Sequence, residues 1–145
     1  MDYRAQPSAL PVDRTILVVT FRGQVHRLDR DTGAIVWTNE LKGGGYDEAF
    51  LAVGFGVVIV STSTSKVFCI DYLTGATRWE AATSSMGRAT ILIEPTQIIC
   101  CKEGYIDCFS PDGGMLWRQP MAGTGLGRAA LGLPGNVAQA DDGHD

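Results

Sequence analysis

The sequence predicts an all-β protein built from short strands and tight turns. Charged residues make up 19% of the chain, whereas globular proteins average about a quarter. The 145 residues include 18 glycines, and 45% are hydrophobic. Runs of β-branched and apolar residues at 16–20, 57–61 and 97–101 each precede a second short run in which apolar and polar residues alternate. These features are typical of buried strands joined by turns.

A unit of strands, turn and tryptophan is repeated three times. Trp37, Trp79 and Trp117 follow one another at intervals of about 40 residues, which is the period of propeller blades. Four residues before each tryptophan stands a glycine that can adopt the positive φ of a hairpin turn. These glycines are Gly33, Gly75 and Gly113. We therefore expect a β-propeller in which each tryptophan packs between neighbouring sheets.

Short polar side chains stand where a strand of each unit ends. Asp29 and Asp71 can accept hydrogen bonds from the backbone N–H groups of the turn that follows. In the third unit Ser110 takes this place, and the turn is one residue shorter. These residues are expected to shape the turns, and not to carry out chemistry.

The repeated pattern resembles the tryptophan-docking repeat of the quinoprotein-type β-propellers, Ala-x-Asp-x-x-Thr-Gly-x-x-x-Trp. That family includes pyrroloquinoline-quinone dehydrogenases and the propeller lipoprotein of outer-membrane protein assembly. The second copy fits with Cys69 in place of Ala, whereas the first copy has Arg27 there. The resemblance covers about residues 15–133 and implies a fold, but no particular activity. The residues that match the structural motif are Asp29, Thr32, Gly33, Trp37, Asp71, Thr74, Gly75, Trp79, Gly113 and Trp117.

The repeat also predicts how the chain is divided. Residues 15–133 hold strands in groups of three, four, four and one, so three four-stranded blades form if the last strand completes the first blade. That last strand lies in 127–134, which echoes the opening of the third blade at 87–95. Residues 1–14 are expected to be a flexible N-terminal segment, and residues 134–145 an acidic flexible tail.

Three blades make half a propeller, and a ring typically needs four to eight. Open ends would expose apolar surface, which usually marks an interface. The simplest closed assembly is a two-fold homodimer with six blades, in which residues 128–133 pair with residues 16–20 of the partner. A trimer with nine blades and the recruitment of a different propeller fragment are the alternatives.

Composition and charge exclude several partners. The formal net charge is −4, so the chain lacks the basic surface that nucleic acids and anionic membranes require. No apolar run approaches the ~18 residues of a membrane span, and residues 1–7 do not resemble a secretory signal. The sequence therefore predicts a cytoplasmic protein with reduced cysteines. None of the cysteines shows the spacing of a zinc site.

Cys100 and Cys101 need a separate interpretation, because quinone dehydrogenases of the resembled family can carry a vicinal disulfide against their cofactor. In this sequence the two cysteines continue the apolar run of Ile98 and Ile99. One side chain would then point to each side of a buried strand. Cysteine commonly fills such interiors, so we interpret both as structural. No cofactor, no metal site and no catalytic residue is expected.

Arg88 and Arg128 enter the innermost strands of two blades at equivalent positions. Together they could surround the mouth of a central channel and contact an anion or a partner. Each arginine could instead form an ion pair with a nearby acidic residue, which the frequency of structural ion pairs favours.

Together these features predict a non-catalytic scaffold or protein-binding module that works through assembly of a ring. Its partners would be a second copy of itself and a protein that the sequence does not identify. One alternative is a quinone- or metal-dependent oxidoreductase, for which polar ligands are too few. Another is a propeller that senses a small ligand or sugar, although the repeat already assigns its tryptophans to docking.

Overall fold

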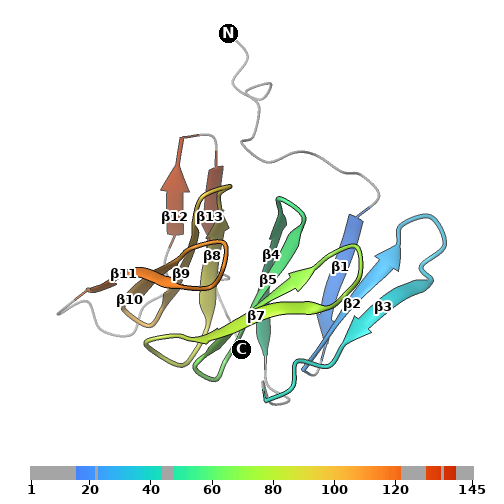
Figure 1. Cartoon of the computed structure of the whole chain (residues 1–145), viewed down its shortest axis with the longest axis horizontal. Helices are drawn as coiled ribbons and strands as arrows, with labels where there is room; N and C mark the ends of the chain where they lie inside the picture. Colours follow the sequence, from blue (N-terminus) through green and yellow to red (C-terminus); the bar gives the residue numbers. More distant parts are fainter. Residues whose placement is uncertain (1–15, 22, 44–47, 122–129, 135, 140–145) are drawn as a thin grey trace, which may run out of the picture.

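The structure is a computed structural model that describes residues 16–21, 23–43, 48–121, 130–134 and 136–139. The regular secondary structure of these residues is all β-strand, and the strands form antiparallel sheets (Figure 1). Among the described residues there is no helix that is long and apolar enough to cross a membrane. The prediction of an all-β chain is confirmed.

The strands of each sheet follow one another in sequence, as in a meander. The first sheet contains β1 (Ile16–Phe21), β2 (Gln24–Asp29) and β3 (Ile35–Asn39). The second contains β4 (Ala49–Gly54), β5 (Val57–Thr62), β6 (Lys66–Asp71) and β7 (Thr77–Ala82). The third contains β8 (Ala89–Ile93), β9 (Ile98–Lys102), β10 (Tyr105–Phe109) and β11 (Met115–Pro120). A final pair consists of β12 (Ala130–Leu133) and β13 (Asn136–Gln139).

The sheets stand side by side in chain order, like the blades of an open fan (Figure 1). β4, the first strand of the second sheet, contacts both β1 and β8, and the β12–β13 pair lies beside β8. The last strands of the sheets, β3, β7 and β11, each pair with only one neighbour. This arrangement is a partial β-propeller and confirms the fold class that the repeat predicts. The first blade has three strands among the described residues.

The core lies between the sheets and not within any one of them. Side chains of β5 point alternately toward the two neighbouring blades, so that Ile59 packs in a cluster with Ile91 whereas Val58 packs in a cluster with Val25. All six residues of β5 are buried. A strand that is covered on both faces reads as a continuous apolar run, as this one does. Full burial of each large apolar side chain stabilises the fold by about 1.5–3 kcal/mol.

The far face of the third sheet is covered by the last strand pair. Leu92, Ile99 and Cys108 form a small buried cluster there, against which Leu131 and Leu133 of β12 pack. The end of the chain therefore begins a further layer, in the place where the next blade of a propeller would stand.

β13 corrects the expectation for the end of the chain. Residues 134–145 were expected to form a flexible tail, but Asn136–Gln139 form a strand that pairs with β12 from Ala130↔Gln139 to Leu133↔Asn136. The described residues therefore hold one strand more than the sequence predicts. Between these two strands the sequence contains a Pro-Gly dipeptide, which favours a turn. The expected flexible segment at 1–14 lies outside the described residues.

Candidate functional site

The turns after β2 and β6 are built in the same way. Oδ1 of Asp29 accepts hydrogen bonds from the N–H groups two and three residues further on, at 2.8 and 3.1 Å. Oδ1 of Asp71 makes the equivalent two bonds, at 2.9 and 3.1 Å. Gly33 and Gly75 then adopt φ angles of 76° and 79°, in the left-handed region that favours glycine. The two turns are thus close structural copies.

The electrostatics of the two turns differ at one point. Hydrogen bonds from the backbone N–H groups of residues 31 and 32 lower the pKa of Asp29. The pKa of Asp71 is also lowered, and there the main cause is Arg78, whose Nη2 lies 2.7 Å from Oδ2. In the third unit Oγ of Ser110 accepts the N–H of Gly114 at 3.1 Å, so a hydroxyl replaces the carboxylate.

Trp37 on β3 joins the first sheet to the second. Its Nε1 donates a hydrogen bond to the carbonyl of Tyr72 at 2.7 Å. The ring lies so close to Gly75 that a Cβ there would be 2.6 Å from Cδ2 of the indole. Nδ2 of Asn39 adds bonds to the carbonyl of Gly75 and to Oγ1 of Thr77, both at 2.9 Å. Gly75 therefore has no room for a side chain, in addition to its positive φ.

Trp79 on β7 joins the second sheet to the third in the same way. Its Nε1 donates to the carbonyl of Pro111 at 2.7 Å, and a Cβ at Gly113 would be 2.6 Å from Cδ2 of the indole. The ring centroid of Phe109 lies 6.0 Å from that of Trp79, within the range of favourable aromatic contacts. We call each such contact, an indole on the glycine of the next blade, a docking seam.

The repeat leaves one half of a docking seam at each end of the described fan. Trp117 on β11 has 43% of its surface exposed. At the other end, the space where a Cβ of Gly33 would lie has no heavy atom within 4 Å. One end thus presents an indole and the other presents the turn on which such an indole docks.

Lys102, at the end of β9, connects the second and third sheets below the surface. Its Nζ donates to the carbonyls of Thr62 and Thr64, both at 2.7 Å, and to Oγ1 of Thr83 at 3.2 Å. Only 2% of the residue is exposed, and this burial lowers the pKa of the ammonium group to about 8. Three acceptors match its three donors, so Lys102 serves as a structural link.

Asp107 is a second buried charge, close to Lys102 in sequence. It accepts hydrogen bonds from the N–H and hydroxyl of Ser84, and from Nε of Arg118 at 3.0 Å. Neither Lys102 nor Asp107 is a residue that the sequence predicts to be important, although a charge at the end of an apolar run, as at Lys102, is a usable signal. Arg118 faces Asp107 across the β10–β11 ladder, whereas the acceptors of Lys102 at Thr62 and Thr64 come from the neighbouring blade and could not be inferred.

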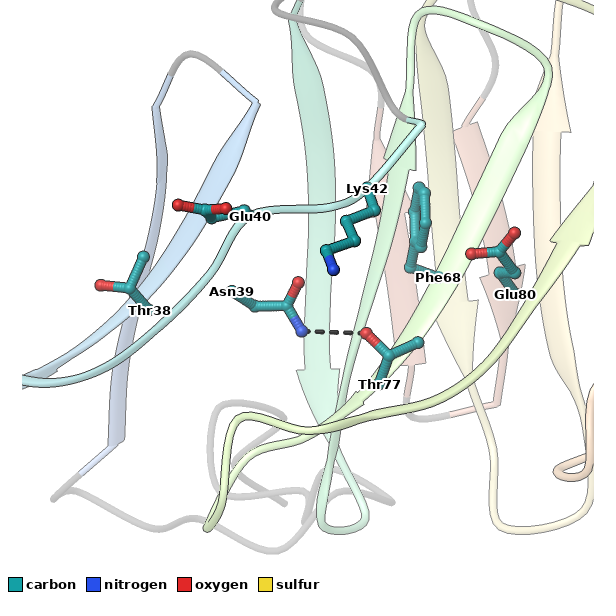
Figure 2. Close-up of a pocket in the computed structure, with 7 residues that line it drawn as sticks. All are labelled: Thr38, Asn39, Glu40, Lys42, Phe68, Thr77 and Glu80. Atoms are coloured by element: carbon teal, nitrogen blue, oxygen red, sulfur yellow. Dashed lines mark hydrogen bonds between the residues drawn. The ribbon is translucent and has the colours of Figure 1, made fainter.

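A groove of about 560 Å³ opens between the outer strands of the first two sheets (Figure 2). The hydrogen bond from Asn39 to Thr77 crosses it, and Figure 2 shows Lys42 extending toward that bond. The lining residues are Thr38, Asn39, Glu40, Lys42, Phe68, Thr77 and Glu80. The three tryptophans are not among them, so the groove does not offer the indole surface that a sugar-binding propeller would use.

The predicted channel-mouth arginines are described only in part. Nη2 of Arg88 lies 3.5 Å from Oε1 of Glu48, which corresponds to the ion-pair interpretation. Arg128 lies outside the described residues. The grouping of the two guanidinium groups around a channel therefore stays a prediction.

The adjacent cysteines do not fit a quinone cofactor. Cys100 and Cys101 are free thiols with 1% and 7% of their surface exposed, and Cys100 packs in the cluster that contains Ile59 and Ile91. Burial raises the pKa of Cys100 to about 11 and also raises that of Cys101. Both are thus buried thiols that are neutral near pH 7, and neither presents its sulfur at the surface for a cofactor to contact. Across the described ranges, no group of three or more His, Cys, Asp or Glu residues could hold a metal ion.

Propeller blades joined by docking seams define the class of this protein: it is a β-propeller of the tryptophan-docking, quinoprotein-like type. The chain belongs to the family described as outer membrane protein assembly factor BamB, whose model matches residues 3–103. The resemblance seen in the repeat is thereby confirmed. Among curated proteins, none matches the sequence.

Several solved structures share the fold. BamB from Moraxella catarrhalis superposes with a TM-score of 0.66 and 24% identity, over 87% of this chain and 40% of that one. The computationally designed Ika8 protein superposes with a TM-score of 0.71 and 16% identity, over 92% of this chain and 42% of that one. For quinohemoprotein alcohol dehydrogenase ADHIIG from Pseudomonas putida HK5 the TM-score is 0.61 and the identity 18%, over 75% of this chain and 19% of that one. The chain thus spans less than half of each, and at these identities the likeness concerns the fold alone.

Proposed function

We propose that this chain is a non-enzymatic, protein-binding scaffold that works as part of a complete propeller ring. The observation that carries the proposal is the pair of half-seams at Trp117 and Gly33, because each presents one side of the contact that joins the described blades to one another. Membership of a family described as an assembly factor supports a role in contacts between proteins. Loops at the rim of a rigid disc would make those contacts.

A second copy is the proposed source of the missing blades. Two copies would form a ring of six blades, within the four to eight that close. Two of these blades would be shared between the copies. In each of them, β12 of one copy would pair with β1 of the other and so add a fourth strand to the β1–β3 sheet. In the structure β13 occupies the edge of β12 that β1 would take, so closure requires β13 to leave. The exchange would replace the four residue pairs between β13 and β12 with pairs between β12 and β1 of the other copy.

The oxidoreductase alternative receives support only from fold likeness to dehydrogenases, because the adjacent cysteines face the interior. Its test is direct: purified protein is supplied with pyrroloquinoline quinone and Ca²⁺, and dye reduction with primary alcohols is measured. Turnover that depends on the cofactor would overturn the scaffold proposal.

The scaffold itself is tested by affinity capture from the native cell, with partners identified and then reconstituted from pure components. The expected result is a defined partner that binds in a fixed ratio to the ring. A chain that captures no protein reproducibly, at any tested salt concentration, would count against this function.

The compartment stays a prediction. Four buried free thiols suit the reducing cytoplasm that the sequence suggests, whereas the family description refers to the outer membrane. Fractionation of the native cell distinguishes the two.

A further inference from the structure

We propose that Trp117 of one copy docks on the Gly33 turn of a second copy, forming between chains the seam that occurs twice within the chain. The inference rests on the proposed ring assembly and names the residues that would hold it together. A closed pair would contain two such seams, because each copy contributes one indole and one turn.

The Gly33 turn matches the turn that Trp37 already uses. In both, the glycine N–H returns to the aspartate carbonyl, at 2.8 Å for Gly33 and 2.7 Å for Gly75. The aspartate N–H in turn donates to the carbonyl of the residue after the glycine, at 2.8 and 2.9 Å. The φ angles differ by only a few degrees. The Gly33 turn thus has the same structure as the Gly75 turn that accepts Trp37, but its glycine is uncovered.

Trp117 leaves its sheet as the docked indoles do. It stands opposite Cys108 on the neighbouring strand, as Trp79 stands opposite Cys69 and Trp37 opposite Arg27. In all three hairpins the ladder changes register immediately after that pair. The same bulge at the same place aims the three side chains alike. The exposed indole is therefore already oriented for docking.

The surroundings of the turn show what the missing indole would cover. Ile70 and Phe109, which precede the Asp71 and Ser110 turns, are 0% and 1% exposed. Leu28 holds the same place before the Gly33 turn and is only half-buried. Trp117 of a second copy would cover Leu28, and its Nε1 would face the carbonyl three residues before Gly33, as Trp37 faces that of Tyr72.

A polar contact accompanies the indole. Asn39, two residues after Trp37, donates to the carbonyl of Gly75. Gln119 stands two residues after Trp117, and its amide is now bonded to the adjacent carbonyl of Pro120 at 2.9 Å. By turning to the carbonyl of the partner's Gly33, this amide would reproduce the bond that Asn39 makes.

The chain cannot close this seam on itself. Trp117 is on β11 and Gly33 lies between β2 and β3, and the complete second blade stands between these two sheets (Figure 1). A second copy of the chain carries both missing halves at once. This complementarity selects it over an unrelated partner.

The test compares four proteins by mass in solution over a range of concentrations: wild type, Trp117→Ala, Gly33→Ala and Gly56→Ala. A Cβ at Gly33 would occupy the place of the incoming indole, just as a Cβ at Gly75 would lie 2.6 Å from Trp37. Gly56 is the matched control, because its φ is +79 and no heavy atom lies near its Cβ position either. We expect wild type and Gly56→Ala to dimerise with equal Kd. The other two should dimerise at least about 100-fold more weakly, as loss of a central tryptophan contact usually causes.

Mixing Trp117→Ala with Gly33→Ala provides a second test, whose expected result cannot be produced by misfolding of either variant. Trp117→Ala retains a good turn and Gly33→Ala retains a good indole, so one seam can form between them. We expect the mixture to form heterodimers more tightly than either variant forms homodimers. Dimers that are unaffected by both substitutions would overturn this docking but leave ring assembly standing. A wild type that is monomeric throughout would overturn docking between copies, whereas the scaffold role is decided separately by partner capture.

Discussion

The second and first sheets of this protein are built from similar apolar strands, but only the second is covered on both sides. β5 is buried at all six residues, whereas on β1, which pairs with β2 as β5 pairs with β6, Leu17 and Val19 are 42% and 39% exposed. The difference arises because the second sheet has a blade on each face and the first has only one. The stability of a blade is thus largely a property of its neighbours, as expected for a repeat protein.

The tryptophans show the same difference more directly, because one sequence motif occurs in two environments. Trp79 has a docked ring and a hydrogen bond to Pro111, while Trp117 stands at the equivalent position of its hairpin and is 43% exposed. Local sequence places both indoles, and the presence of the next turn decides whether either contributes to stability.

The largest effect is expected for Trp79→Ala. Removing the ring opens a cavity between the second and third sheets and leaves the carbonyl of Pro111 without its donor, so unfolding should become easier by about 3–5 kcal/mol. Trp117→Ala in a dilute, monomeric sample should change stability by less than about 1 kcal/mol. Urea titrations of both variants measure the loss of stability, and equal losses would show that docking on the next blade does not stabilise the protein.

Gly75→Ala should be the next most harmful substitution. The new Cβ meets the indole of Trp37 at 2.6 Å, and the positive φ adds strain, for a combined loss of about 3 kcal/mol. Gly33→Ala carries the strain alone, which should cost about 1 kcal/mol. Thermal unfolding at low protein concentration separates the two values. A similar loss at both positions would show that strain, and not docking, governs the turn.

The buried ammonium group of Lys102, between the second and third sheets, should make the stability of the protein depend on pH. Burial lowers its folded pKa from 10.5 to about 8, so between these values the unfolded state binds more protons than the folded state. The contribution of Lys102 to stability should therefore rise with pH in this window, by about 3 kcal/mol in all at about 1.36 kcal/mol per pKa unit, because the folded form loses its buried charge first. Lys102→Met should lack this rise. Urea titrations of both proteins at several pH values measure it, and identical pH profiles would contradict the assignment.

The smallest effect is expected in acid and compares the Asp71 and Asp29 turns. Both carboxyls have a folded pKa below their usual value of 3.8, so their contribution is present above that pH and is lost as the pH falls through the folded pKa. Arg78→Gln should weaken the acid dependence that belongs to Asp71 and leave Asp29 unchanged. NMR titration of the two carboxyl groups reports both pKa values. A shift at Asp29 in this variant would mean that the turns are coupled.

The features that could be predicted are the ones that depend on residues close together in sequence. The turn that Asp29 and Gly33 close is set by hydrogen bonds within a few residues, and the hairpin bulge beside each tryptophan is similarly local. The features that were missed cross between blades or depend on the end of the chain. Lys102 binds carbonyls near Thr62, forty residues away, and nothing in its own strand indicates those acceptors.

The sequence alone determined the all-β class, the period of the blades and the positions of the tryptophans and of the turn glycines. Those properties follow from backbone preferences and side-chain alternation, which act over short distances. Only the tertiary structure decided which seams are filled, where the groove opens and that β13 pairs with β12. These depend on which sheets are neighbours, and an apolar residue is buried only when another blade is present to cover it.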